Sequence, residues 1–255
     1  MIWINTLNPI ALSLGSFSIR WYGIAYMLSF ILGYLWLATL AKKKLVNLTL
    51  TEVDSLIFAV ILGVILGGRL GDFLFYNIQI FWQNPLQILR IWEGGMSFHG
   101  GLAGVILAVI WFSKRYRKSF LEITDLLTIP TTIGLFFGRL ANFVNGELWG
   151  KPTDGSFGVV FPRADNLPRY PSQLFEAVKN VIIGSILILT LRVKTKRGIL
   201  SFLFLTLYGV GRITVELLWR ESLDGFIAGV PSGAFWSIPV FITGVIGLAW
   251  ILRKR

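Results

Sequence analysis

Two arginines, one histidine and several tyrosines lie in or beside long apolar stretches of this sequence, where charged side chains are rare. Arg139 and Arg212 are the two arginines, and His99 is the only histidine of the chain. A guanidinium presents a planar set of donors that matches phosphate oxygens. Histidine is the side chain whose ordinary pKa lies near neutrality. These residue types indicate a site that binds a phosphate and moves a proton.

The composition excludes several other chemistries. The chain contains no cysteine, which excludes disulfides, cysteine nucleophiles and cysteine metal ligands. A single histidine also excludes a metal site built from several histidines. We therefore expect neither a metal ion nor another cofactor.

The elements that carry these residues belong to a membrane protein. The 255 residues are 55% hydrophobic and 15% charged, with a mean hydropathy of +0.70. Soluble domains average about 45–50% apolar residues and about 25% charged residues, so an ordinary soluble enzyme is excluded. The abundance of large apolar residues also excludes a disordered chain. We predict an all-α, polytopic membrane protein that forms one integral-membrane domain, 1–255.

Seven apolar stretches are long enough to cross a bilayer as helices, which takes about 17–25 residues. They cover residues 19–41, 55–76, 96–113, 125–143, 171–191, 198–219 and 236–252. The first stretch has no basic leader and is followed by lysines at 42–44, so we expect a retained helix rather than a cleaved signal.

Clusters of Lys and Arg follow every second stretch and predict the orientation. They lie at 42–44, 114–118, 192–197 and 253–255. Basic residues in short loops mark the cytoplasmic face, so we expect the N-terminus outside and the C-terminus in the cytoplasm. The net charge of +11 then reflects topology and contact with anionic lipids, and no nucleic-acid partner is expected.

With this orientation, polar residues from six helices lie near the outer ends of those helices. They are Tyr22, Tyr26, Arg69, Asp72, His99, Arg139, Asn142, Gln173, Glu176, Arg212 and Glu216. Each ionisable residue inside a bilayer costs about 2.5–3.5 kcal/mol on insertion scales and usually faces a cavity or the bundle interior. The shared depth predicts one site on the extracytoplasmic side.

Ion pairs within one helix offer a structural explanation for some of these residues. Arg69 lies three residues before Asp72, and for it we favour the structural role. Arg212 lies four residues before Glu216, and both roles stay open there. Arg139 has no acidic residue three or four positions away on its own helix. We therefore expect the anion for Arg139 to come from elsewhere, such as a lipid phosphate.

Glycines predict where two of the helices pack. Gly63, Gly67 and Gly71 recur every four residues in one stretch, and Gly100 and Gly104 do so in the next. Such spacing allows helix backbones to approach closely. The segment 78–93 is too short to span and, with its tryptophans, is expected at the outer interface. The loop 144–170 is expected to form an outer arm or lid.

The string GRLANFVNGELWG at 138–150 resembles the signature of bacterial prolipoprotein diacylglyceryl transferases. Five further segments resemble the family, in the family's order. They are RWYG at 20–23, GGRLGDFLFYN at 67–77, GGMSFHGGLAGV at 94–105, PSQLFE at 171–176 and YGVGRITVE at 208–216. The resemblance therefore extends over nearly the whole chain.

This resemblance implies an activity. The family transfers the diacylglyceryl group of phosphatidylglycerol to the lipobox cysteine thiol of a preprolipoprotein and releases glycerol 1-phosphate, the first step of bacterial lipoprotein maturation. It implies phosphatidylglycerol, the lipobox segment and membrane lipid as partners, and no cofactor. It places the protein in the bacterial inner membrane with its site facing the extracytoplasmic side.

The chemistry assigns expected roles to the residues. A thiol has an ordinary pKa of about 8.5 and a histidine one of about 6.5, so we expect His99 to be the base or to orient the thiol; a tyrosine is the alternative base. Arg139 and Arg212 are expected to hold the phosphate as charge gathers on it. By resemblance, six residues complete the site: Tyr22, Asn142, Glu147, Gly150, Tyr208 and Glu216.

Other function classes fit some of the same residues. A seven-helix carrier or channel for an anionic lipid also places arginines and a histidine near an outer mouth. Carriers, however, show repeats or interrupted helices at mid-membrane, whereas the polar residues here gather on one side. A receptor-like binding module is a third and weaker alternative. The sequence favours the enzyme.

Overall fold

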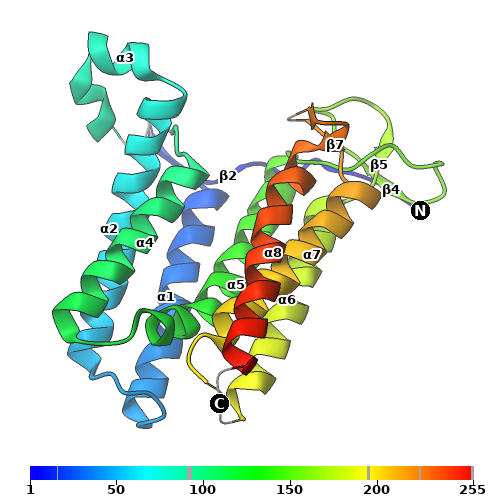
Figure 1. Cartoon of the computed structure of the whole chain (residues 1–255). Helices are drawn as coiled ribbons and strands as arrows, with labels where there is room; N and C mark the ends of the chain where they lie inside the picture. The colour runs from blue at the N-terminus through cyan, green and yellow to red at the C-terminus, as the bar shows by residue number, and fades with distance from the viewer. Residues whose placement is uncertain (16, 91–93, 194–195, 224, 254–255) are drawn as a thin grey trace. The chain divides into compact units, whose positions relative to one another are not determined.

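The structure, a computed structural model, describes residues 1–15, 17–90, 94–193, 196–223 and 225–253. It is mostly helical, and each apolar stretch expected to be a helix forms one (Figure 1). The long helices are α1 (Trp21–Lys42), α2 (Leu50–Phe75), α4 (Phe98–Tyr116), α5 (Phe120–Asn145), α6 (Ser172–Leu191), α7 (Ile199–Leu218) and α8 (Ser232–Arg253).

Six of these helices are long and apolar enough to cross a membrane: α1, α2, α5, α6, α7 and α8. The chain is thus a multi-pass membrane protein. The helix expected at 96–113 forms as α4, which has 19 residues and carries Lys114 and Arg115 in its last turn. It is not among the six, so length and composition give one span fewer than the sequence analysis expects.

Local side-chain chemistry sets several helix ends. Thr49 caps α2 in a reciprocal pair with Glu52, whose carboxylate accepts from the Thr49 backbone N–H at 2.7 Å. Such a capping box satisfies two backbone donors that the first helical turn leaves free. The Ser97 hydroxyl accepts from the backbone N–H of Gly100 at the start of α4. The Ser97 cap places the first turn of α4, which carries His99.

Short strands, which the sequence analysis did not anticipate, accompany the helices. One sheet has the order β1–β4–β5 and joins β1 (Ile2–Ile4), β4 (Gly158–Val160) and β5 (Pro168–Arg169). Strand β1 runs parallel to β4, and β5 runs antiparallel to β4. Two hairpins pair β2 (Ile10–Leu14) with β3 (Phe17–Arg20) and β6 (Phe226–Ile227) with β7 (Val230–Pro231). Strands of two to five residues are too short to produce a clear alternating pattern in the sequence.

The chain folds into two compact units. The first contains Met1–Gly33 and Asp125–Arg255, and the second contains Tyr34–Thr124. Within the first unit, β4, β5 and β7 lie at one end of the bundle of α5 to α8, and the last turn of α8 lies at the other end (Figure 1). The end with the strands is the one that carries the loop 144–170.

In the second unit, α2 and α4 pack side by side along the glycines that the sequence analysis singled out (Figure 1). A Cβ atom on Gly63 would lie 2.6 Å from the carbonyl oxygen of Gly104. A Cβ atom on Gly71 would lie 2.6 Å from the Cα atom of Gly100. The two backbones are therefore in direct contact, and the expected close approach is confirmed.

Arg69, near the end of α2, holds the segment that follows this helix in place by hydrogen bonds. Its guanidinium donates to backbone carbonyls of Gln87, Ile88, Arg90, Gly94 and Gly95. This segment contains α3 (Ile78–Gln83) and the 3-10 helix η1 (Pro85–Leu89). These contacts support the structural role favoured for Arg69, with main-chain carbonyls as the acceptors.

The packing of α2 on α4 gives a first prediction. Gly104→Ala inserts a methyl group against the backbone of Gly63, and overpacking of this kind costs about 1–3 kcal/mol. Gly101→Ala is the matched control, because its Cβ atom would lie at an ordinary 3.7 Å from the Val64 carbonyl oxygen. Thermal unfolding in detergent is expected to show a lower Tm for Gly104→Ala than for Gly101→Ala. Equal Tm values would contradict the close contact.

Candidate functional site

Glu176 is the buried centre of a cluster of charges in the first unit. It lies in the second turn of α6 and has no exposed surface. Its Oε1 accepts from Arg212 Nη1 at 2.8 Å, and its Oε2 accepts from Lys179 Nζ at 2.7 Å. Arg139 Nε lies 3.6 Å from the same Oε2. Cations from α5, α6 and α7 thus meet at one carboxylate.

A second carboxylate, that of Glu216, extends the cluster toward the end of α7. Its Oε2 lies 3.0 Å from Arg212 Nη2 and 3.5 Å from Arg220 Nε. The first turn of α8 packs against this group, since a Cβ atom on Gly233 would lie 2.5 Å from Glu216 Oε1 and 2.9 Å from Arg212 Nη2. Glycine at 233 therefore allows α8 to cover the ion pair.

Asn142 connects this cluster to Tyr22 on α1 and to Glu147, which follows α5. Its Oδ1 accepts from Arg139 Nη1 at 3.2 Å. Its Nδ2 donates to Glu147 Oε1 at 2.8 Å and to the hydroxyl of Tyr22. The amide is buried, with 4% of the residue exposed. Asn142 therefore fixes the orientation of Arg139 and joins it to Tyr22 and Glu147.

The chain turns sharply after α5, which returns Glu147 to Asn142. Gly146 adopts a φ of +64°, a conformation that glycine accepts at little cost. The backbone N–H of Glu147 donates to the Asn142 carbonyl at 3.1 Å. Gln173 Nε2 on α6 donates to the Glu147 carbonyl at 2.7 Å. The turn is held from both helices.

Gly150 positions Arg220 by a close approach of two backbones. The two residues form an isolated antiparallel bridge. A Cβ atom on Gly150 would lie 2.5 Å from the Trp219 carbonyl oxygen. The Gly150 N–H donates to the Tyr170 carbonyl at 2.9 Å. The role of Gly150 is to let the loop lie against the segment that carries Arg220.

The formal charges of the cluster leave one positive charge in excess. Its cations are Arg139, Lys179, Arg212 and Arg220, and its carboxylates are Glu147, Glu176 and Glu216. Burial and then the positive charges of Arg212 and Arg139 lower the pKa of Arg220 to about 10. Arg220 Nη1 is buried and has no hydrogen-bond partner within the part of the chain that the structure describes. This arrangement suits a ligand with one negative charge.

The structure brings together eight of the nine expected site residues. Tyr208 reaches the cluster through Lys179, whose Nζ lies 4.3 Å from the centre of the Tyr208 ring. The ninth, His99, belongs to the second unit. It is exposed in the first turn of α4, and its ring packs edge-on against Phe98 at 5.6 Å between centroids.

Two members of the cluster, Lys179 and Arg220, escaped the sequence analysis. Lys179 lies three residues after Glu176, a spacing that places both side chains on one face of α6. Arg220 lies four residues after Glu216, just beyond the end of α7. From the sequence we expect the anion for Arg139 to come from elsewhere, such as a lipid phosphate. In the structure Arg139 is paired with Glu176 on another helix, so the protein itself supplies part of the negative charge. A contact between helices leaves no spacing signal.

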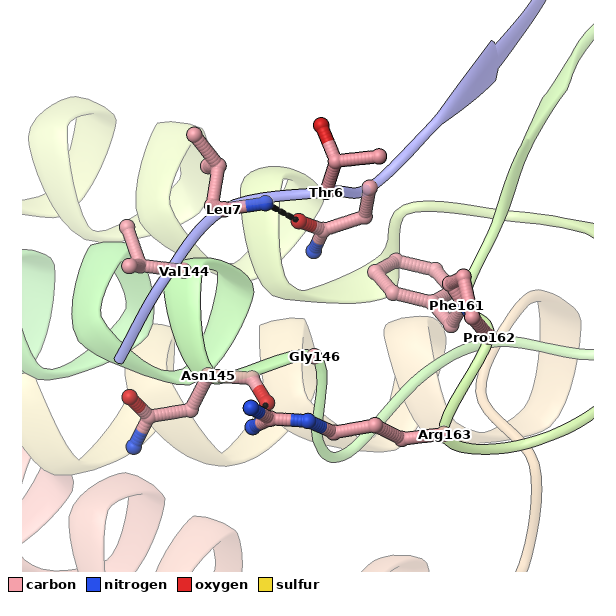
Figure 2. Close-up of a pocket in the computed structure, with 9 residues that line it drawn as sticks. Thr6, Leu7, Val144, Asn145, Gly146, Phe161, Pro162 and Arg163 are labelled. Atoms are coloured by element: carbon pink, nitrogen blue, oxygen red, sulfur yellow. Dashed lines mark hydrogen bonds between the residues drawn. The ribbon is translucent and has the colours of Figure 1, made fainter. Parts of the chain in front are cut away.

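Beside the cluster, the end of α5 borders a cavity of about 230 Å³. Residues 5–7, 144–146 and 161–163 line it (Figure 2). Arg163 Nη1 donates to the Asn145 carbonyl at 2.7 Å, and the Asn5 Nδ2 donates to the Phe143 carbonyl at 2.7 Å. These bonds hold the N-terminal strand and the loop against the end of α5.

Comparison with known proteins matches residues 9–250 to the family model described as prolipoprotein diacylglyceryl transferase. A phosphatidylglycerol–prolipoprotein diacylglyceryl transferase of Pseudoalteromonas atlantica is 43% identical, over 98% of this chain and 91% of its own length. Proteins of the same name are 41% identical in Nitrosomonas europaea, over 96% and 90% of the two chains, and 42% identical in Polynucleobacter asymbioticus, over 97% and 96%.

The loop that begins at Gly150, beside Arg220, contains an ion pair with a predictable pH response. Arg169 Nη2 lies 2.6 Å from Asp165 Oδ2, and Arg169 Nη1 donates to the Gly150 carbonyl at 3.0 Å. Hydrogen bonds from the Arg169 guanidinium, and then from the Leu167 backbone, lower the pKa of Asp165 below its ordinary 3.8. A lowered pKa stabilises the loop above pH 3.8, and this stabilisation is lost as the pH falls through the lowered value.

Hydrogen exchange of residues 150–170 tests this response. Protection is expected to stay constant from neutral pH down to the ordinary pKa and to fall below it. Asp165→Asn is expected to reduce protection already at neutral pH. Asp154→Asn is the matched control, because Asp154 accepts only from Ser156 in the hydrogen bonds described. The assignment is wrong if the two variants behave alike.

Proposed function

The chain belongs to the prolipoprotein diacylglyceryl transferase family, and we propose that its cluster of buried charges binds the phosphate of phosphatidylglycerol during transfer. The protein is a membrane transferase of lipoprotein biosynthesis, and its substrates are phosphatidylglycerol and a prolipoprotein. The diacylglyceryl group moves from the lipid to the thiol of the lipobox cysteine.

The excess positive charge of the cluster is the observation that carries this proposal. A phosphodiester has one negative charge, and the cluster is short of one negative charge. Arg139 and Arg212 contribute guanidinium groups from two helices, which match phosphate oxygens in geometry. A phosphate between them would complete the pairing of the four cations.

The proposed reaction breaks one carbon–oxygen bond and forms one carbon–sulfur bond. The thiol loses its proton to a base, and the resulting thiolate attacks the diacylglyceryl carbon that bears the phosphate. The bonding electrons leave with the phosphate oxygen, which gives glycerol 1-phosphate. Arg139 and Arg212 stabilise the charge that gathers on this oxygen, since donors fixed in a water-poor site favour the transition state.

The other residues hold this arrangement. Asn142 orients Arg139 and contacts Tyr22 and Glu147. Glu216 holds Arg212 from the same helix, while Tyr208 lies one turn before Arg212 on α7. Gly150 lets the loop approach Arg220. We propose His99 as the base or as the residue that orients the thiol, with Tyr22 or Tyr208 as the alternative base.

We further propose how the protein lies in the membrane. The chain acts as one integral-membrane domain, 1–255, in the bacterial inner membrane. Seven helices cross the bilayer, with α4 as the seventh, so that the N-terminus is outside and the C-terminus is cytoplasmic. The basic residues that come after α1, α4, α6 and α8 support this orientation. The cluster then faces the extracytoplasmic side.

Replacement of Arg139 tests the phosphate site. Purified protein, phosphatidylglycerol and a synthetic lipobox peptide are combined, and peptide mass and glycerol phosphate release are followed. Arg139→Ala is expected to lower kcat/KM at least ~100-fold, the loss typical for removal of one preorganised donor. Arg139→Lys keeps the charge without the planar group and is expected to recover only part of the activity.

Arg115→Ala, in the last turn of α4, is the control and is expected to match the wild type. A mass gain must depend on the peptide's cysteine. Full activity of Arg139→Ala would refute the phosphate site. A folded wild type that gives no mass gain, under conditions where a relative is active, would instead favour a lipid carrier.

His99→Gln tests the base in the same assay. Loss of a general base typically lowers the rate about 10²–10⁴-fold, so kcat is expected to fall by this amount with little change in KM for phosphatidylglycerol. Phe98→Leu, which replaces the ring packed against His99, is the control for local disturbance. Near-normal turnover of His99→Gln would assign the proton to a tyrosine, and Tyr22→Phe and Tyr208→Phe would then be compared.

A further inference from the structure

Lys179 is a buried lysine within a helix long and apolar enough to span the membrane. Its side chain is 11% exposed, and its Nζ lies 2.7 Å from Glu176 Oε2. The same ammonium lies over the Tyr208 ring at 4.3 Å. Its aliphatic part fills the space beside Gly211, where a Cβ atom would lie 2.6 Å from Lys179 Cδ. Because a buried charge is costly, this lysine needs an explanation.

The three cations around Glu176 lie at unequal distances from its carboxylate oxygens. Arg212 and Lys179 take one oxygen each, at 2.8 and 2.7 Å. Arg139 Nε stands 3.6 Å from the oxygen that Lys179 holds. Charge-assisted bonds between guanidinium and carboxylate are normally about 2.7–2.9 Å long. Lys179, and not Arg139, makes the short contact with this oxygen.

The contacts of Arg139 are long on its other side as well. Its Nη1 lies 3.2 Å from Asn142 Oδ1. This neutral acceptor sets the direction of the guanidinium without neutralising it. Arg139 is thus oriented by Asn142 and only weakly paired with Glu176, as a ligand for an incoming anion needs to be.

We propose that Lys179 is a positioning residue for the transfer reaction: it occupies Glu176 and thereby keeps Arg139 available for the phosphate of the substrate lipid. It also holds the ring of Tyr208 beside Arg212. This inference rests on the proposed role of Arg139 as a phosphate ligand.

Removal of the Lys179 ammonium is expected to weaken the binding of phosphatidylglycerol. Lys179→Met keeps an unbranched apolar chain beside Gly211 but frees Glu176 Oε2. Arg139 then closes on this oxygen, and the cluster loses its excess positive charge. The KM for phosphatidylglycerol is expected to rise about 10- to 100-fold, as for the loss of one charge-assisted hydrogen bond. The change in kcat is expected to be smaller.

The double variant Lys179→Met with Glu176→Gln distinguishes this role from a merely structural one. The neutral amide cannot form an ion pair with Arg139, and the cluster recovers one excess positive charge. The KM of the double variant is therefore expected to fall back toward the wild-type value. Two independent losses of structure would instead add, so the double variant would be worse than Lys179→Met alone.

Matched variants complete the experiment. Lys118→Met removes another lysine paired with a glutamate, 3.3 Å from Glu52 Oε1, and is expected to leave KM unchanged. Lys179→Arg keeps a cation beside Glu176 and is expected to raise KM less than Lys179→Met does. If Lys179→Met does not fold, Lys179→Leu, which also lacks a hydrogen-bond donor, replaces it in both the single and double variants.

The outcomes separate the two proposals. A wild-type KM for the uncharged single variant, or a double variant worse than that variant, overturns the role of Lys179. If Arg139→Ala abolishes transfer in the same assay while Lys179→Met behaves like the wild type, only the role of Lys179 fails. If Arg139→Ala keeps the wild-type KM and turnover, the phosphate site itself fails.

Discussion

The burial of one carboxylate, that of Glu176, constrains the rest of the first unit. An ionised carboxylate without exposed surface is tolerated only where cations and donors compensate the loss of water. Here the compensation comes from three helices, through Arg139 on α5, Lys179 on α6 and Arg212 on α7. The relative register of these helices is fixed by this requirement. Removing one partner of a buried pair typically costs about 3–5 kcal/mol, so the cluster stabilises the fold that presents it.

Glycines leave the space that the charged side chains of the cluster occupy. Gly146 turns the chain back so that Glu147 meets Asn142. Gly150 has no side chain, which leaves space for the backbone that carries Arg220. In the same way, Gly233 lets the first turn of α8 pack against Glu216. The signature string thus combines two kinds of residue. Arginine, asparagine and glutamate supply the charges and hydrogen bonds, while the glycines supply a positive φ or a close contact.

The sequence predicted the helices well because a long apolar stretch has few alternatives in a membrane. It also predicted close backbone approach at the glycines of α2 and α4, since glycine spacing reports directly on close packing. It did not predict the sheet of β1, β4 and β5, whose strands are too short for a periodic signal. It missed Lys179, although the spacing from Glu176 was readable, and it did not identify Glu176 as the partner of Arg139, because a contact between two helices leaves no spacing signal. The six residues that the resemblance added lie in one cluster, but the resemblance did not show which of them pair.

The charge balance of the cluster also explains how binding and catalysis are separated under the proposed mechanism. One excess positive charge is enough to bind a phosphodiester, whereas the leaving phosphate monoester gains further negative charge as the carbon–oxygen bond breaks. Donors that are already fixed and incompletely paired, such as Arg139 and Arg220 Nη1, interact more strongly with the leaving group than with the substrate. Only such a difference accelerates the chemical step. A fully neutralised cluster would stabilise the protein equally well. It would not, however, interact more strongly with the developing charge of the leaving group than with the bound substrate.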